Sequence, residues 1–297
     1  MISARRRRTV ATLLLAAVTA LGSGCAATIA SGHAQSTKIQ SALDTARAEP
    51  VEVRFICLAP SPYTGRKDSL RAGYGIVRSL QILIEEHDLP LRVTYYDGSD
   101  TVSGTSAPPD SEEAERAASL VRGAGVLIIG GSTWSQGPAF YLRRFFEFAG
   151  GENLGGVSAG AWATAGGAHT GGEVVVDTTL RSLMGMGAQT FSLGQKYMVF
   201  TTDERDGPTP GEFTLLDVWF MDQFARTIAV VALKQGDPAG ARLLADALGT
   251  NPVYYVNLPE DLSPWEPLQL FLNAAADLES PESSALRDAM SPGLPTP

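Results

Sequence analysis

The chain has 297 residues, a formal net charge of −9 at pH 7, and hydrophobic residues at 44% of its positions. This apolar content is enough to bury a core and excludes global disorder, and the acidic balance argues against a general nucleic-acid surface. Two cysteines make neither a disulfide scaffold nor a cysteine-rich metal site. The 31 glycines are the informative part of the composition, because 12 of them lie within residues 130–172.

The first 24 residues have the organisation of a signal peptide. Four consecutive arginines, at positions 5–8, precede an apolar run at residues 10–21, which is too short to cross a membrane as a helix of about twenty apolar residues. Small residues then lead to Cys25, a pattern that resembles the lipidation site of bacterial lipoproteins. We expect export and a lipid anchor at Cys25; secretion without a lipid, an uncleaved anchor and twin-arginine export stay open. Removal of the four arginines changes the net charge from −9 to −13.

Strand and helix patterns alternate after a linker of small and polar residues at 25–50. In chain order we expect a strand at 51–58, a helix at 69–86, a strand at 91–96, a helix at 111–122, a strand at 125–130, a helix at 138–149, a strand at 157–164, a helix at 174–186, a strand at 188–193 and a helix at 213–233. This order predicts an α/β fold over residues 51–235, with a doubly wound five-stranded parallel sheet and helices on both faces.

Residues 236–279 form an extension beyond that domain, to which the sequence assigns no function. We expect a helix at 239–248, a short strand at 253–258 and a helix at 264–278. Residues 280–297 are rich in Pro and Ser, which favours a disordered tail.

The loop after the first strand has the composition of a phosphate-binding loop. It offers the hydroxyls of Ser61, Tyr63 and Thr64, the glycine Gly65, and two cations, directly before a helix N-terminus. The spacing is not that of a P-loop, and an ordinary solvated turn is the alternative.

The loops after the third and fourth strands are suited to a flat ligand. Residues 130–138 (G-G-S-T-W-S-Q-G-P) place Trp134 among small hydroxylic residues, where it can stack on a planar ring or serve as a surface anchor. Residues 165–172 (A-G-G-A-H-T-G-G) hold four glycines, which let backbone N–H groups approach a ligand, and His169. The three histidines are scattered, so we expect no zinc site and treat His169 as a ligand-loop or solvated residue.

These loops resemble those of a known family, the flavodoxin-like NAD(P)H:quinone reductases of the tryptophan-repressor-binding-protein type, within the NADPH-dependent FMN reductase superfamily. The run G-S-T-W-S-Q-G-P leads to F-F-E-F-A-G-G, and A-G-G-A-H-T-G-G-E leads to L-R-S-L-M-G-M-G, in the order and spacing of the family's motifs. The resemblance covers about residues 51–234. It implies a flavodoxin-like fold and FMN as cofactor.

The resemblance also implies a role for each loop residue. The FMN phosphate would be held by Ser61, Tyr63, Thr64 and Gly65. The isoalloxazine edge would be lined by Ser132, Thr133, Trp134, Gln136 and Gly137. Its other side would be closed by Ala165, Gly166, Gly167, His169 and Gly171. The chemistry would be carried by FMN, without a catalytic side chain or a metal, and electrons would pass from NAD(P)H to a quinone or another acceptor. A homo-oligomer stays open, and the location would be the cell envelope.

Two other functional classes stay open. Residues 156–160 (G-V-S-A-G) fit the G-x-S-x-G elbow that carries the nucleophile Ser158 in hydrolases and amidotransferase-like domains, although the flanking sequence is a poor strand and a poor helix. The chain would alternatively be a degenerate flavodoxin-like lipoprotein that binds a partner and no flavin.

Overall fold

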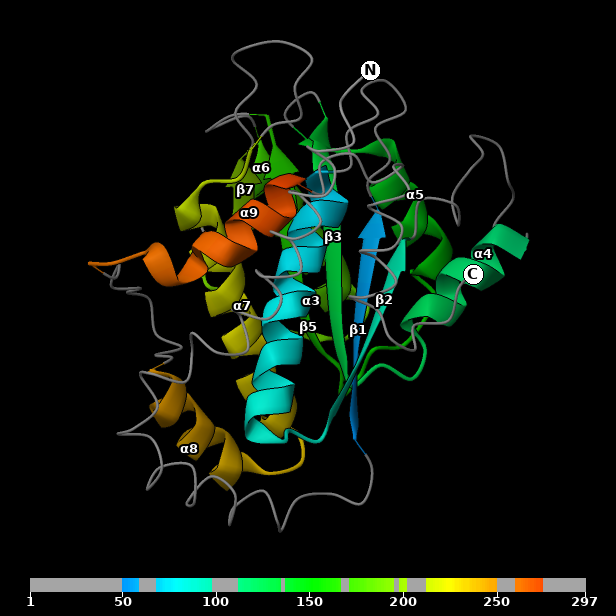
Figure 1. Ribbon diagram of the computed structural model, residues 1–297. Helices are drawn as coiled ribbons and strands as arrows, with labels where there is room; N and C mark the ends of the chain where they lie inside the picture. Colours follow the sequence, from blue (N-terminus) through cyan, green and yellow to red (C-terminus); the bar gives the residue numbers. More distant parts are fainter. Residues whose placement is uncertain are drawn as a thin grey trace, which may run out of the picture.

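A parallel β-sheet with helices on both faces forms the centre of the protein in the computed structural model (Figure 1). The structure describes residues 50–58, 68–97, 112–134, 137–166, 171–194, 198–201, 212–249 and 260–274. The described strands form one seven-stranded sheet whose main path is β2-β1-β3-β5-β6, with β4 paired to β3 and β7 paired to β5.

The strands at the centre of this sheet are apolar on both faces. β1 (Val51–Leu58) lies between β2 (Leu91–Asp97) and β3 (Val126–Trp134), and β3 lies between β1 and β5 (Ser158–Ala165). All of these pairs are parallel, and continuous apolar runs are expected where helices cover both faces. The chain winds from β1 to β2 and then crosses to β3 on the other side, so a topological switch point lies between β1 and β3.

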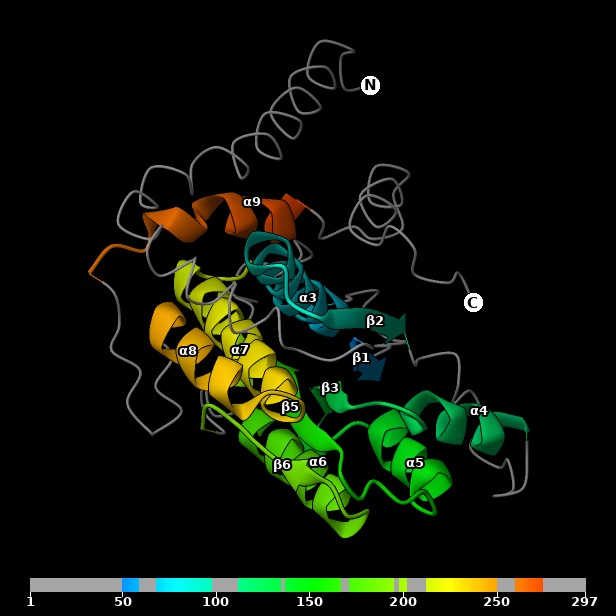
Figure 2. The same cartoon turned by 90° about the horizontal axis from the view of Figure 1, so that it is seen from below.

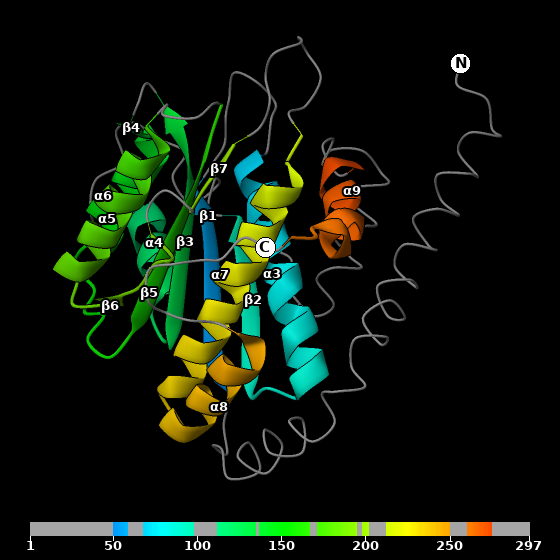
Figure 3. The same cartoon turned by 90° about the vertical axis from the view of Figure 1, so that its left-hand side faces the viewer.

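Two layers of helices enclose the sheet (Figures 2 and 3). One face carries α3 (Asp68–His87) and α7 (Leu215–Lys234), which pack against each other. The other face carries α4 (Glu112–Val121), α5 (Phe140–Ala149) and α6 (Gly172–Gly185). Each successive crossover therefore places its helix on the face expected for a doubly wound sheet, as the sequence predicted.

The C-terminal extension packs on the α3–α7 face. α8 (Pro238–Leu248) contacts α7, and the short helix η5 (Ser263–Trp265) leads into α9 (Glu266–Ala274), which contacts both α3 and α7. The predicted helices of the extension are thus confirmed up to Ala274. The predicted strand at 253–258, the tail, the signal peptide and the linker lie outside the described residues.

Two expected strands differ from the sequence prediction. β3 runs on to Trp134, beyond the predicted end at residue 130, because residues 131–132 pair with β5 and the last two residues pair with the antiparallel β4 (Gly137–Pro138). The predicted strand at 188–193 is reduced to β6 (Gln189–Thr190), and the chain returns to the same edge as β7 (Val199–Thr201). The edge strand is therefore split, with residues 191–198 between its two pieces.

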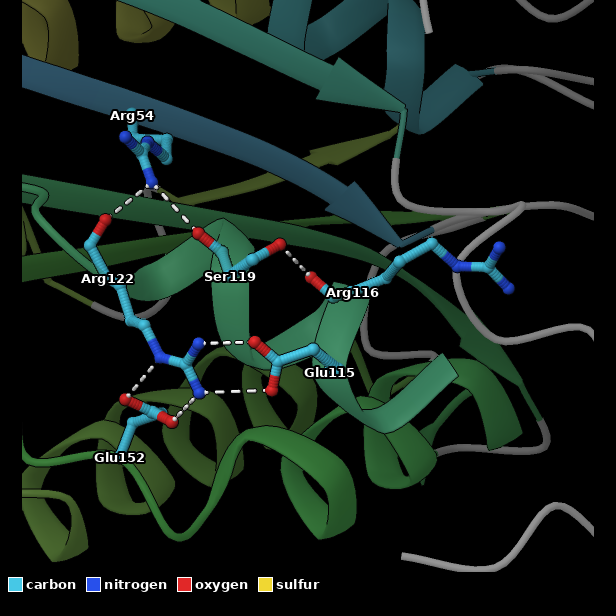
Figure 4. Close-up of polar contacts among 6 residues, drawn as sticks. All are labelled: Arg54, Glu115, Arg116, Ser119, Arg122 and Glu152. Atoms are coloured by element: carbon cyan, nitrogen blue, oxygen red, sulfur yellow. Dashed lines mark hydrogen bonds and ion pairs between the residues drawn. The ribbon is translucent and has the colours of Figure 1, made fainter. Parts of the chain in front are cut away.

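Two arginines, Arg54 and Arg122, connect the C-terminal end of α4 to neighbouring elements (Figure 4). Nη1 of Arg54, on β1, donates to three carbonyl oxygens there, those of Ser119 at 3.3 Å, Leu120 at 2.9 Å and Arg122 at 2.8 Å. The Arg122 side chain bridges Glu115 on α4 and Glu152 after α5, at 2.5 and 2.8 Å. The last carbonyl oxygens of a helix lack intrahelical donors, and Arg54 supplies a donor from the sheet. The ion pair of Arg122 with Glu152 joins α4 to the segment after α5.

Across the described residues, we find no helix with the length and apolar character needed to cross a bilayer.

Candidate functional site

The carboxyl ends of the central strands meet at one edge of the sheet. Leu58, the last residue of β1, is in register with Gly131 on β3, and Ser132 is in register with Thr164 on β5. The loops that the sequence analysis selected after these strands therefore open on the same edge. This edge includes the switch point between β1 and β3, where ligands bind in open α/β sheets.

The second predicted loop is a β-hairpin rather than a loop. Thr133 pairs with Pro138, and Trp134 pairs with Gly137, so β3 and β4 form an antiparallel pair with a defined register at the carboxyl edge. Ser132 and Thr133 are half-buried. The side chain of Trp134 and the whole of Gln136 lie outside the part of the chain that the structure describes. The hairpin holds four of the five predicted residues in one short segment.

One side chain at this edge, Thr133, carries a buried hydroxyl, Oγ1, that lacks a hydrogen-bond partner among the described residues. An unsatisfied buried hydroxyl costs free energy, so native proteins usually provide a protein, water or ligand partner. This position is one that the sequence assigned to a ligand.

The third predicted loop leaves β5 and enters α6. Ala165 is buried as the last residue of β5, and Gly166 follows it as an exposed residue. Gly171 is the N-cap of α6 with a φ of 95°, a left-handed conformation that favours glycine. α6 contacts both β3 and β4, so this loop re-enters beside the hairpin. Gly167 and His169 lie outside the described residues.

The first predicted loop, with Ser61, Tyr63, Thr64 and Gly65, lies outside the described residues, but both of its anchors are placed. It leaves from Leu58 at the end of β1 and returns at Asp68, where α3 begins. The next residue, Ser69, is buried, and its hydroxyl is hydrogen-bonded to the hydroxyl of Thr164 on β5. The first turn of α3 is thus held against the same edge as the other two loops.

Trp162 is a structural residue at this site that sequence reasoning missed. Its indole is fully buried on β5, and Nε1 donates to the carbonyl oxygen of Ser69 at 3.3 Å. Gly130, its register partner on β3, leaves the space for the indole, because a Cβ there would lie 1.9 Å from the Trp162 ring. A glycine inside an apolar strand was the available signal, since it often marks a close approach.

The nucleophile elbow that the sequence left open as an alternative is not formed. Ser158 is the first residue of β5 and lies at the amino end of that strand, at the edge of the sheet opposite the predicted loops. Its backbone N–H donates to the carbonyl oxygen of Gly125 at 3.1 Å. A nucleophile elbow needs the serine on a tight turn after a strand and before a helix, which this position does not provide.

Two further residue predictions concern metals and thiols. In the part of the chain that the structure describes, no group of three or more His, Cys, Asp or Glu side chains is arranged to hold a metal ion. Cys57 is buried within β1, as expected of a small core residue. Cys25 lies outside the described residues.

Comparisons with known proteins give structural likeness only. No protein-family model and no curated protein matches the chain. Among solved structures, an oxidoreductase from Corynebacterium diphtheriae is 18% identical, with a TM-score of 0.45 over 67% of this chain and 99% of that one. A WrbA-like flavodoxin from Agrobacterium tumefaciens is 13% identical, with a TM-score of 0.40 over 62% and 99% of the two chains.

A third similar structure is much longer than the matching region. The rubredoxin oxygen:oxidoreductase of Desulfovibrio gigas is 14% identical, with a TM-score of 0.39, and the match covers 63% of this chain but only 37% of that one. The strand order of this chain and the helices on both faces of its sheet define an α/β fold of the flavodoxin-like type.

Proposed function

We propose that the chain binds FMN at the carboxyl edge of its sheet and is an oxidoreductase that passes electrons from NAD(P)H to a quinone or another acceptor. The observation that carries this proposal is the orphaned hydroxyl of Thr133 on the β3–β4 hairpin, directly beside the switch point. The flavin would supply a centre that accepts hydride and releases electrons, so no acid or base from the chain is required for the first step.

The described residues offer glycine backbone and hydroxyl groups of the kind that this cofactor would need. Gly166 and Gly171 border the re-entrant loop without side chains, so backbone N–H groups can approach a flat ring. Ser132 and Thr133 provide hydroxyls for the polar rim of the ring, with Thr133 as the donor or acceptor that lacks a protein partner. The first turn of α3 presents backbone N–H groups to an anionic group such as the FMN phosphate.

The direct experiment is flavin binding by purified protein. The chain from residue 26 onward is expected to carry, or to take up, FMN with an absorption band at about 450 nm, and to oxidise NAD(P)H in the presence of a quinone. A colourless protein that FMN cannot reconstitute contradicts the proposal and favours a partner-binding module without flavin.

A conservative substitution tests the orphaned hydroxyl. Thr133→Val keeps the shape of the side chain and removes the buried Oγ1, so we expect FMN affinity to fall by about tenfold without loss of folding stability. Thr179→Val is the matched control, because its buried hydroxyl already donates to the carbonyl oxygen of Val175 at 2.7 Å within α6. An unchanged FMN affinity in Thr133→Val removes the main support for this site.

We also propose that the protein acts at the cell envelope, as a lipoprotein anchored through Cys25. The support is the sequence of residues 1–25 alone, with its basic, apolar and small-residue segments. Metabolic labelling with a fatty-acid analogue tests it. Label is expected on the full chain and not on Cys25→Ser, and unlabelled full chain contradicts the lipid anchor.

A further inference from the structure

Two exposed apolar side chains lie on the outer face of α6. Val174 near its start is 49% exposed and Met184 near its end is 58% exposed, while the inner face of the helix packs on strands β3, β4 and β5. The two residues are about 15 Å apart along the helix and about 80° apart around its axis. Figure 2 shows α6 at the margin of the molecule.

Two opposite charges lie between these apolar residues on the same helix. Nε of Arg181 donates to Oδ2 of Asp177 at 2.6 Å, and the two side chains are 76% and 34% exposed in that order. An exposed ion pair within one helix adds little stability to a single chain. The guanidinium of Arg181 has further N–H donors, so it can also bind a second carboxylate.

The apolar pair and the charged pair are centred on the same position of α6. Residue 179 is five positions from Val174 and from Met184, and it is two positions from Asp177 and from Arg181. A two-fold axis beside residue 179 would bring the α6 helices of two copies together in antiparallel orientation. Val174 would then face Met184 of the partner subunit, and Asp177 would face Arg181 of the partner subunit. Each contact would occur twice, as in every isologous interface.

We infer that α6 is the interface of a homodimer, in which two copies of this chain pack antiparallel about residue 179. Apolar contacts close the two ends of this interface, and two reciprocal ion pairs between Asp177 and Arg181 occupy its middle. Gly185 is exposed, and apart from its own helix backbone and chain neighbours no atom lies within 4 Å of the place that a Cβ would take, so it leaves room beside Met184. The inference goes beyond the proposed function and does not depend on flavin binding.

The charges of this face favour a second copy as its partner. A helix face with one acidic and one basic residue at mirrored positions is complementary to itself, whereas a nucleic acid or an anionic membrane surface would repel Asp177. The unbranched and flexible side chain of Met184 can adapt its shape to Val174 of the partner subunit.

The length of the helix limits the strength of the dimer. α6 has 14 residues and is about 21 Å long, so one pair of these helices buries less area than a standard interface of about 1,600 Å². We therefore expect a reversible dimer with a dissociation constant of about 10 µM rather than an obligate dimer.

Sedimentation equilibrium of the chain from residue 26 onward, which contains all described residues, tests the dimer. The average mass is expected to rise from that of a monomer toward that of a dimer as the concentration passes through about 10 µM. Met184→Gln removes an apolar contact at each end of the interface, so its dissociation constant should rise about tenfold. Leu270→Gln is the matched control, because Leu270 is 66% exposed and lies on α9, and its dissociation constant should not change.

Charge reversal tests the register of the two copies. Asp177→Arg gives the face two positive charges and Arg181→Asp gives it two negative charges, so each variant alone should stay monomeric up to about 100 µM. An equimolar mixture of the two variants should form a heterodimer, with a dissociation constant within about threefold of that of the native dimer. Both variants lack the ion pair within the helix, so only contacts between copies can restore association.

Thermal unfolding shows whether each variant is folded. If Asp177→Arg does not fold, Arg181→Asp and Met184→Gln decide the inference by themselves, since both should weaken the dimer while Leu270→Gln should not. A native chain that stays monomeric at every concentration overturns the inference. It is also overturned by a dimer that these variants leave unchanged, or by an equimolar mixture of folded charge variants that remains monomeric.

Discussion

The indole of Trp162 occupies the space above Gly130 that a side chain on the neighbouring strand would otherwise fill. The two residues are register partners on β5 and β3, and a Cβ at Gly130 would lie 1.9 Å from Trp162 Cε2. Trp162 also contacts Phe55 on β1, with ring centroids 6.2 Å apart, and supports Ser69. The core of the sheet and the start of α3 therefore share one buried side chain.

Gly130→Ala is expected to destabilise the protein by about 3 kcal/mol, because the added Cβ would overlap the fully buried indole of Trp162. Chemical denaturation measures the change. Gly131→Ala is the matched control, since a Cβ there would meet only Leu142 Cδ2 at 3.3 Å and other atoms at 3.8 Å. Equal stability of the two variants contradicts the tight packing at Gly130.

Thr164→Val is expected to lower the free energy of unfolding by about 1–2 kcal/mol, because the buried hydroxyl of Ser69 loses its partner. In the double variant Ser69→Ala/Thr164→Val both hydroxyls are absent. Its total loss should therefore be smaller than the sum of the two single losses, as a double-mutant cycle measures. Strict additivity is the result that speaks against a hydrogen bond between them.

The ion pairs of Arg122 predict an acid-dependent stability. Hydrogen bonds from Arg122 lower the pKa of Glu115 and of Glu152, so their contribution is present above the ordinary value of 4.5 and is lost as pH falls through the lower folded values. Arg122→Gln should lower Tm by about 1–2 °C at pH 7, and this difference should shrink progressively as pH falls below 4.5.

Arg116→Gln is the control for this prediction. Arg116 lies on the same helix and is exposed, and its guanidinium forms no ion pair with the described residues (Figure 4). A Tm that falls equally in both variants, or a difference for Arg122 that does not shrink as pH is lowered, is inconsistent with the ion pairs.

His87, the last residue of α3, predicts a second pH effect. Its partial burial lowers its pKa, Glu86 opposes this shift and Arg226 adds to it. The folded state therefore binds a proton less readily than the unfolded state, and stability falls as pH drops below about 6.5. His87→Gln should reduce this decline in thermal unfolding between pH 7 and 5. An unchanged pH profile rules out His87 as its source.

The local pattern of residues was sufficient to predict the order of the elements. The apolar run of β1 is confirmed at Val51–Leu58, and α3 and α7 begin and end within two residues of their predicted ends. Because a covered parallel strand and an amphipathic helix are each encoded within a short segment, periodicity reveals them without knowledge of the partner. The alternation of these elements then limited the topology to a doubly wound sheet.

The edge of the sheet was less predictable, for a physical reason. β3 extends to Ser132 through pairing with β5 and to Trp134 through pairing with β4, and the edge strand divides into β6, opposite residues 158–159 of β5, and β7, opposite residues 163–165. Pairing of this kind depends on the neighbouring strand. Pairing of this kind also excludes the alternative of an elbow at Ser158, because Ser158 begins a strand that lies beside β3.

The sequence by itself determined the α/β alternation and which loops gather at the carboxyl edge, because both follow from short-range patterns and the chain order. Only the tertiary structure decided which residues hold those loops in place. Ser69 meets Thr164, Gly130 makes room for Trp162, and Arg71 joins α3 to Leu272 across 201 positions of the chain. These contacts join segments distant in sequence, and their partners are defined only when the chain has folded and buried them together.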